Sequence, residues 1–454
     1  MLECGGPAFT LMKFRYGIED RPPLFESLLM GLQWCAVALP LMIVFGKIAA
    51  GVQGLDSAGE IMYLQKIAFI MAIFLLLEIL LGHRLPLIMG PSSVILVGIV
   101  SSAGYSASSV YTAILFGGLV LAIVSATGCF VYLRRLFTRR VVSVVLLLIA
   151  FTLTPSIISL TTQAGSGPGP GENLSFAIFV SLVMFVLHRY LTRVWKSILI
   201  LLSMVWATAA YLLLFPQTGA TTEMMRQLAP FSFFFQNMTT TFSFDAGLLI
   251  AFFVGFVALS INDLGSIESM SAVVEASEKA KRVNRGIMFT GLANAVSGLF
   301  GVIGQVNYSF SVGVVVASGC ASRFALIPTV LIFLGLSLSP ALLGTISNIP
   351  SVVVGSILLY VLATQAATGF MSAFNESQQF TLEDGLVIGT PLLMAVMATY
   401  VPAQVLQSFP PSVHPIISNG FVVGVTATLL LEHGIFRKRS QTAHQDKKES
   451  AIRR

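Results

Sequence analysis

Residues 90–104, GPSSVILVGIVSSAG, and residues 304–319, GQVNYSFSVGVVVASG, are two copies of one short pattern in an extremely apolar chain. At an offset of 215 residues the copies share four valine and glycine positions, Val97, Gly98, Val100 and Gly104 against Val312, Gly313, Val315 and Gly319. Each copy follows a glycine-containing break and is too short, and too polar at its start, for an ordinary membrane span. Paired interrupted segments of this kind indicate the substrate site of a secondary transporter.

The composition is that of a membrane protein with many spans. Of 454 residues, 56% are hydrophobic and 10% are charged, whereas a soluble domain has about 25% charged residues. The apolar runs are near 20 residues long, which is enough to cross a hydrocarbon core of about 30 Å. Residues 1–26 carry Lys13, Arg15 and Arg21 and do not have the pattern of a signal peptide. We therefore expect an all-α polytopic protein of the plasma membrane (in a bacterium, the inner membrane) without a soluble domain.

The apolar runs predict fourteen spans. They lie near 27–51, 61–82, 85–104, 110–133, 141–163, 174–191, 194–215, 245–270, 287–303, 305–319, 322–345, 349–370, 385–402 and 412–432. After the eighth span, residues 270–282 (MSAVVEASEKAKR) predict an amphipathic helical extension on the cytoplasmic side.

The basic residues predict the orientation. Placing the N-terminus in the cytoplasm puts 23 of the 26 Lys and Arg residues on that side and leaves Lys47, Lys66 and Arg226 elsewhere. Such a bias is the positive-inside rule, and it places both termini in the cytoplasm. The same distribution explains the net charge of +6, so no nucleic-acid partner is expected.

Fourteen spans divide as seven plus seven, and an odd number in each half inverts the second half relative to the first. Val37-Ala38-Leu39-Pro40 in the first span and Val257-Ala258-Leu259-Ser260 in the eighth add weak support for this inverted repeat. We expect a cytoplasmic N-terminus (1–26), a core domain in two parts (27–133 and 245–345), a gate domain in two parts (141–215 and 349–432), and a basic cytoplasmic tail (433–454).

Ionisable side chains within the spans are few, and such side chains are usually functional. Asp263 lies in the eighth span among polar neighbours, with no Lys or Arg within a turn. This setting suits a proton carrier or a ligand acceptor; the alternative is a structural carboxylate bonded to a helix end. For Glu78, near His83 and Arg84, we favour a structural charge that is paired or reaches the inner membrane boundary.

Each copy of the repeated pattern predicts a change of backbone. Polar and aromatic residues alternate over 305–311, which indicates a short extended stretch followed by a half-helix from about Ser311. In the first copy, Gly90-Pro91-Ser92-Ser93 carries helix-start signals. Two half-helix starts that face each other would frame a small polar pocket with aromatic walls, suited to a flat heterocycle. Tyr308 or Phe310 could stack on it, or could simply pack between helices, while Asn262, Gln305 and Asn307 read its edge.

On these residues the chain resembles the nucleobase–cation symporter-2 family, the xanthine/uracil permeases or nucleobase–ascorbate transporters. The resemblance covers nearly the whole chain, including FESLLMGLQW (25–34), GHRLPLIMGPSS (82–93) and the block from the eighth to the tenth span. It implies a seven-plus-seven inverted repeat with core and gate domains, short strands in spans 3 and 10, import of a nucleobase with a cation (H⁺, or alternatively Na⁺), and often a homodimer.

The chain departs from the family pattern at several positions. Gln33-Trp34 stands in place of Gln-His, Asn262 in place of the base-holding glutamate, and Ser266 in place of His or Asp; Phe310 occupies the position of a substrate-binding Gln or Glu. The candidate substrate-binding residues are Gln33, Trp34, Ser92, Ser93, Asn262, Asp263, Ser266, Gln305, Asn307, Tyr308, Phe310 and Ser311, with Asp263 as the candidate for proton coupling.

Two other classes of function compete with this reading. An anion transporter of the sulfate-permease type would share the repeat, and two half-helix N-termini suit an anion; Asp263 and the short tail after the last span argue against it. An enzyme is not expected, because no nucleophile–base motif is visible. The five His lie at span ends and in tails, and the four Cys fit no zinc spacing, so neither a metal nor a cofactor is expected.

Overall fold

The computed structural model describes residues 14–128, 130, 136, 138–162, 168–192, 195–196, 198–215, 229–235, 238–239, 241–374, 380–410 and 413–436. The start of the N-terminal segment, most of the predicted basic tail, Cys4, Cys129 and Arg226 lie outside these residues.

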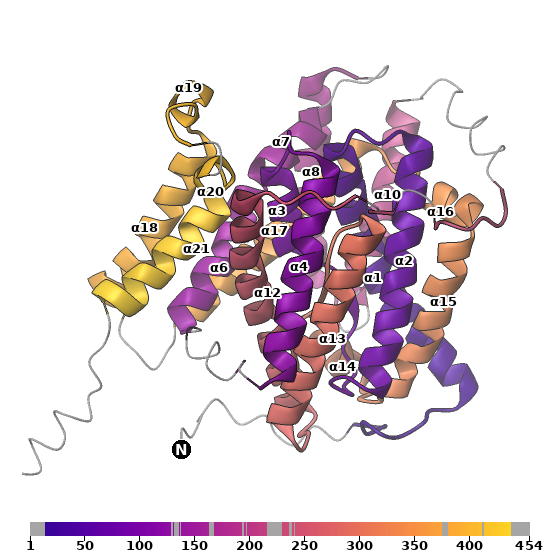
Figure 1. Ribbon diagram of the computed structural model, residues 1–454. Coiled ribbons are helices and arrows are strands. Elements are labelled where there is room, and N and C mark those ends of the chain that lie inside the picture. Colours follow the sequence, from indigo (N-terminus) through magenta and orange to yellow (C-terminus); the bar gives the residue numbers. More distant parts are fainter. Residues whose placement is uncertain are drawn as a thin grey trace, which may run out of the picture.

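Within the described residues, eight helical segments are long and apolar enough to cross a membrane. They are α1 (Leu24–Val52), α2 (Ser57–Leu80), α4 (Ala107–Ala126), the segment Arg139–Thr162 formed by α6 (Arg139–Thr152) and α7 (Thr154–Thr162), α8 (Pro170–Tyr190), α12 (Ala246–Val273), α17 (Ser351–Ala373) and α18 (Leu382–Thr399). The chain is therefore a mostly helical integral membrane protein. Its long helices lie side by side in one bundle (Figure 1).

Other helices complete the bundle. α15 (Ile327–Leu338) follows a short 3₁₀ turn and is bent by 99° against α16 (Pro340–Ser347), where Ser339 and Pro340 interrupt the helix. α10 (Leu199–Leu214) and α21 (Gly420–Leu430) are shorter apolar helices, and α13 (Lys279–Phe300) begins with a basic first turn.

The expected helical extension over residues 270–282 is wrong. α12 ends at Val273, and a turn with left-handed backbone at Glu275 and Glu278 leads directly into α13. The charged residues of this stretch therefore belong to a tight connection between two helices and to the first turn of the second.

Two short strands and two half-helices lie in the middle of the bundle. β1 (Met89–Pro91) pairs antiparallel with β2 (Gln305–Asn307), with Gly90 opposite Val306. α3 (Ser93–Ser101) follows β1, and the Ser92 hydroxyl accepts a hydrogen bond from the Ile95 amide at its start. α14 (Ser311–Ser318) follows β2. These elements lie at the positions where the sequence predicts extended backbone and helix starts.

Strand backbone at this depth needs internal hydrogen-bond partners, because lipid supplies none. The pairing of β1 with β2 satisfies part of this need. The Asn294 side chain of α13 satisfies more, since its amide donates to the Gln305 carbonyl at 2.8 Å and its oxygen accepts from the Gln305 N–H at 3.1 Å. Side chains of a neighbouring helix therefore hold β2 in place.

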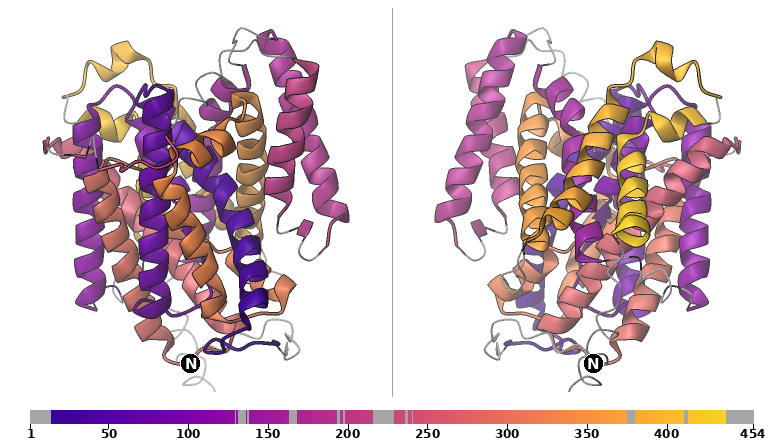
Figure 2. Two further views of the ribbon diagram at one scale, coloured as in Figure 1. Left: turned by 90° about the vertical axis from the view of Figure 1, so that its right-hand side faces the viewer. Right: turned by 90° about the vertical axis from the view of Figure 1, so that its left-hand side faces the viewer.

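The helices pack in two groups. The strand-bearing group comprises α1–α4 and α12–α15, and the outer group comprises α6, α7, α8, α10, α17, α18 and α21. α18 and α21 form one edge of the bundle, and α8 and α10 stand out to one side (Figure 1, Figure 2). The groups meet mainly where α1, α3 and α12 face α6, α10, α17 and α21.

Candidate functional site

A cavity of about 740 Å³ lies between the two groups of helices. The strand-bearing group lines it with Val37, Leu41, Phe45, Ser93, Asn262, Val306, Tyr308, Ser309, Phe310, Gly313, Val314, Val316 and Ala317. The rest of the lining is Leu146, His188, Lys196, Ile200, Tyr360, Val361, Thr364, Gln365 and Thr368. A mostly apolar cavity of this size with a few polar groups is typical of a small-molecule site.

Tyr308 and Phe310 form an aromatic wall of the cavity. Their rings stack with centroids 4.7 Å apart and planes 30° apart. The Tyr308 hydroxyl donates to the Pro91 carbonyl at 2.9 Å, so β1 fixes this ring. Phe310 is 37% exposed and lines the cavity.

The polar groups of the cavity come from several helices. Asn262 of α12 and Ser93 at the start of α3 face it from the strand-bearing group. From the outer group, the His188 ring nitrogen and the Tyr360 hydroxyl share a hydrogen bond of 2.6 Å, and Gln365 presents a primary amide. Amide and hydroxyl groups on both sides can satisfy the donors and acceptors of a heterocycle.

Four of the twelve candidate binding residues line the cavity, namely Ser93, Asn262, Tyr308 and Phe310. The others lie outside its lining and mostly support its walls. Ser92 caps α3, the Ser266 hydroxyl donates to the Asn307 carbonyl at 2.9 Å, and the Ser311 hydroxyl accepts from the Ile88 amide at 3.2 Å. Gln305 is fully buried, Trp34 is 4% exposed, and Gln33 is half-buried on α1.

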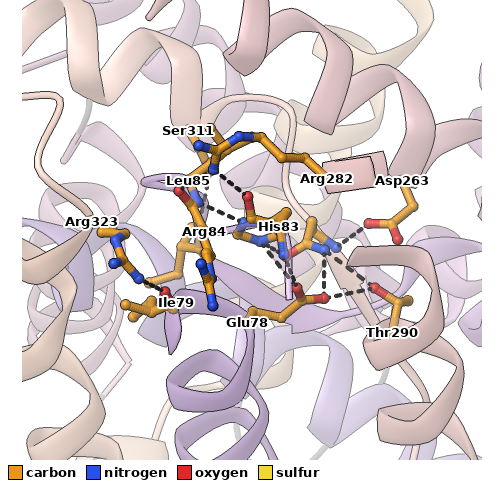
Figure 3. A network of polar contacts seen from close by, with 12 residues as sticks. Glu78, Ile79, His83, Arg84, Leu85, Asp263, Arg282, Thr290, Ser311 and Arg323 are labelled. Atoms are coloured by element: carbon orange, nitrogen blue, oxygen red, sulfur yellow. Dashed lines mark hydrogen bonds and ion pairs between the residues drawn. The ribbon is translucent and has the colours of Figure 1, made fainter. Parts of the chain in front are cut away.

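A polar network lies beside β2, whose residue Val306 lines the cavity; Figure 3 shows the network. Its centre is Asn307 of β2. The Asn307 backbone N–H donates to Asp263 Oδ1 at 3.2 Å, and its side-chain amide donates to Thr290 Oγ1 at 3.2 Å and to Glu78 Oε1 at 3.4 Å. The Asn307 neighbours Val306 and Tyr308 both line the cavity, so a single strand separates the network from the site.

Glu78 is a full member of this network. Its side chain is completely buried, so the expectation that it reaches the membrane boundary is wrong, and its hydrogen-bond partners are neutral groups of His83, Thr290 and Asn307. Its Oε2 accepts from the His83 backbone N–H at 3.1 Å and lies 3.6 Å from His83 Nε2. Glu78 is near the end of α2, and the chain turns back at Gly82, which brings His83 against the carboxylate.

Asp263 is also completely buried. Its Oδ2 has no hydrogen-bond partner among the described residues. Asp263 makes no ion pair with a Lys or Arg there, as its sequence surroundings predict. It points away from the cavity that its neighbour Asn262 lines, since successive helical side chains differ by about 100°.

The outer-group residues of the cavity are absent from the sequence-based prediction. Tyr360, Thr364 and Thr368 recur every four residues along α17, with Gln365 beside them, and this polar stripe in an apolar span was the available signal. Thr290 carries no comparable signal, because its role depends on how α13 packs against β2. No group of three His, Cys, Asp or Glu in the described part of the chain could hold a metal ion.

A helical membrane bundle with two strand-to-half-helix breaks and a cavity between two helix groups is the architecture of a secondary transporter. Comparison with known proteins narrows this class. The xanthine/uracil permease model, described as a permease family, matches residues 25–404. The chain belongs to this family of membrane transporters.

Individual relatives are distant but match over most of their length. The xanthine permease XanP of Escherichia coli is 24% identical over 443 residues, covering 91% of this chain and 93% of the relative. The nucleobase transporter PlUacP of Paenibacillus larvae is 24% identical over 354 residues, covering 75% of this chain and 78% of the relative. The fold is also that of the transmembrane domain of a cyanobacterial bicarbonate transporter, BicA, with a TM-score of 0.60 at 16% identity over 89% of this chain and 97% of that one.

Proposed function

We propose that the protein imports a nucleobase, a purine such as xanthine or the pyrimidine uracil, together with a proton. The observation that carries this proposal is the cavity between the two helix groups in a member of the xanthine/uracil permease family. A base would stack on Phe310, while Asn262, Ser93 and Gln365 bind its edge. The volume of the cavity leaves room for one base and water.

Transport would follow alternating access. The strand-bearing group would act as the core domain that carries the base, and the outer group as the gate against which it slides. Their separate packing supports two rigid bodies, and the cavity between them supports a site that either side can expose. We further propose the seven-plus-seven inverted repeat, cytoplasmic termini and a homodimer, as the family resemblance and the distribution of Lys and Arg imply.

Asp263 would carry the coupling proton. Asp263 follows Asn262 in the sequence, is buried, and accepts a hydrogen bond from the backbone of β2. It therefore contacts the strand that forms a wall of the base site, although its own side chain does not line the cavity. Base binding and protonation of Asp263 would then both act on strand β2. Na⁺ remains the alternative coupling ion.

The Asp263→Asn variant tests the coupling. Proteoliposomes holding the wild-type protein should take up radiolabelled xanthine in response to an imposed pH gradient, and a dye inside should report proton entry. Asp263→Asn should lose gradient-driven uptake by about tenfold or more, because the amide cannot release a proton, with Asp245→Asn at the outer helix end as control. Wild-type uptake that follows a Na⁺ gradient instead would refute proton coupling.

An anion transporter is the second candidate, because the cavity lining contains Lys196 and His188 and no acidic side chain among the described residues. The fold likeness to a bicarbonate transporter is compatible with it. The same proteoliposomes distinguish the two candidates. Bicarbonate or sulfate exchange that Asp263→Asn leaves intact, without uptake of any base, would favour the anion.

A further inference from the structure

Glu78 and Asp263 are the two acidic side chains that are fully buried in the described part of the chain. They come from α2 and α12, 185 positions apart in sequence, and contact the same residue of β2. Asn307 donates hydrogen bonds to both carboxyl groups, and the Thr290 hydroxyl donates to Glu78 as well. The proposed function assigns a role to Asp263 and leaves Glu78 without one.

The cationic groups nearby are engaged elsewhere. Arg282 of α13 donates to the backbone carbonyls of His83 and Arg84, each at 2.9 Å. Arg323 pairs with Glu19 at 2.6 Å and also donates to the Ile79 carbonyl. As Figure 3 shows, both guanidinium groups bind the backbone around the network and neither reaches a network carboxyl group.

His83 supplies no positive charge either. Its Nδ1 accepts a hydrogen bond from the Leu85 backbone N–H at 2.9 Å, so this nitrogen carries no proton. The proton of the neutral ring is then on Nε2, which faces Asn307 Oδ1 at 3.4 Å and Glu78 Oε2 at 3.6 Å. Two carboxyl groups therefore share one buried site with neutral partners.

Two ionised carboxylates cannot occupy such a site together, because burial penalises each charge and like charges repel. We propose that Glu78 and Asp263 form a pair that holds one transported proton in common, so that Glu78 is a second proton carrier. The bare Oδ2 of Asp263 and the Glu78 Oε1 that faces the Thr290 hydroxyl offer alternative positions for this proton.

The step conserves charge. The proton moves between the Asp263 carboxyl and the Glu78 carboxyl, leaving one neutral acid and one anion in either arrangement. Its release to water leaves two carboxylates, which the closed site cannot hold. Release is therefore tied to the entry of water beside β2, and β2 also forms the wall of the base cavity. This link rests on the proposed function, because it takes the cavity as the base site.

Glu78→Gln in the full-length protein tests the pair, because it removes one carboxyl group and keeps the size of the side chain. Two assays in proteoliposomes separate the steps: counterflow of radiolabelled xanthine, which needs no net proton movement, and accumulation driven by a pH gradient. Glu78→Gln should keep counterflow close to wild type and lose gradient-driven accumulation by about tenfold. Glu60→Gln on the same helix, outside the network, is the matched control.

The failures of the two proposals are distinguishable. Wild-type protein that moves no base in either assay would refute the proposed function. Glu78→Gln that accumulates xanthine with the proton dependence of wild type would refute the shared pair while leaving the function intact.

Infrared spectroscopy of the wild-type protein covers the case in which Glu78→Gln does not fold. A pair that holds one proton predicts the carbonyl stretch of a buried carboxylic acid at neutral pH. Its absence would overturn the proposal without any variant.

Discussion

Phe310 is the residue at which the chain departs most visibly from a polar base site, and the structure places its ring in the cavity against Tyr308. An aromatic ring binds a base through its face, whatever the pattern of donors and acceptors on the base edge. Specificity would then depend on the amides of Asn262 and Gln365. If the base stacks on Phe310, replacing this residue should change the affinity for all bases more than the preference among them.

Replacing Phe310 with alanine should therefore raise the apparent KM for all transported bases together. Base–aromatic stacking is worth about 1–3 kcal/mol, which corresponds to about fivefold to hundredfold in affinity. Phe253→Ala, on the exposed face of α12, is the control. An unchanged KM, or a changed order of preference among bases, would show that Phe310 packs between helices without binding the base.

The strand pair is the element that connects the cavity to the buried carboxyl groups. Gly90 of β1 is required for it, because a Cβ at this position would lie 2.5 Å from the Tyr308 ring. Such an overlap forces the ring or the strand to move, and overpacking of this kind typically costs about 1–3 kcal/mol. The glycine therefore serves close packing, since its φ is not in the left-handed region.

The Gly90→Ala variant should reach the membrane and yet transport poorly, because the displaced Tyr308 ring disturbs both the aromatic wall and Asn307. We expect transport at low base concentration to fall by about tenfold. Initial uptake rates normalised to the amount of protein in the membrane measure this effect. Gly255→Ala on α12, where an added Cβ meets nothing within 4 Å, should behave as wild type; equal activity of the two variants would contradict the account.

The sequence was sufficient to locate these elements but not the whole site. The alternation in residues 305–311, the cap at Ser92 and the start of a half-helix near Ser311 depend on local chemistry, so they are readable along the chain. The roles of Glu78 and Thr290 depend on which helices pack together, and local patterns do not encode that. Asn307 was expected to read the edge of the base, and the structure instead turns its side chain toward Glu78 and Thr290.

At the scale of the whole molecule, two helix groups meet across a cavity that neither forms alone. The strand-bearing group holds the strands, both half-helices and the buried carboxyl pair, and the outer group contributes the polar stripe of α17. Movement between the groups would open the cavity to either side while leaving the hydrogen bonds of β1 and β2 intact. Membership of the permease family and this geometry support the same transport cycle.

Uptake by cells lacking their own permeases shows whether this cavity carries nucleobases across the membrane. The panel is radiolabelled xanthine, hypoxanthine, guanine, adenine, uracil and urate, with and without a proton uncoupler. We expect saturable, uncoupler-sensitive uptake of at least one base. If none of the six bases is taken up by cells in which the protein is shown to reach the membrane, nucleobase transport is ruled out.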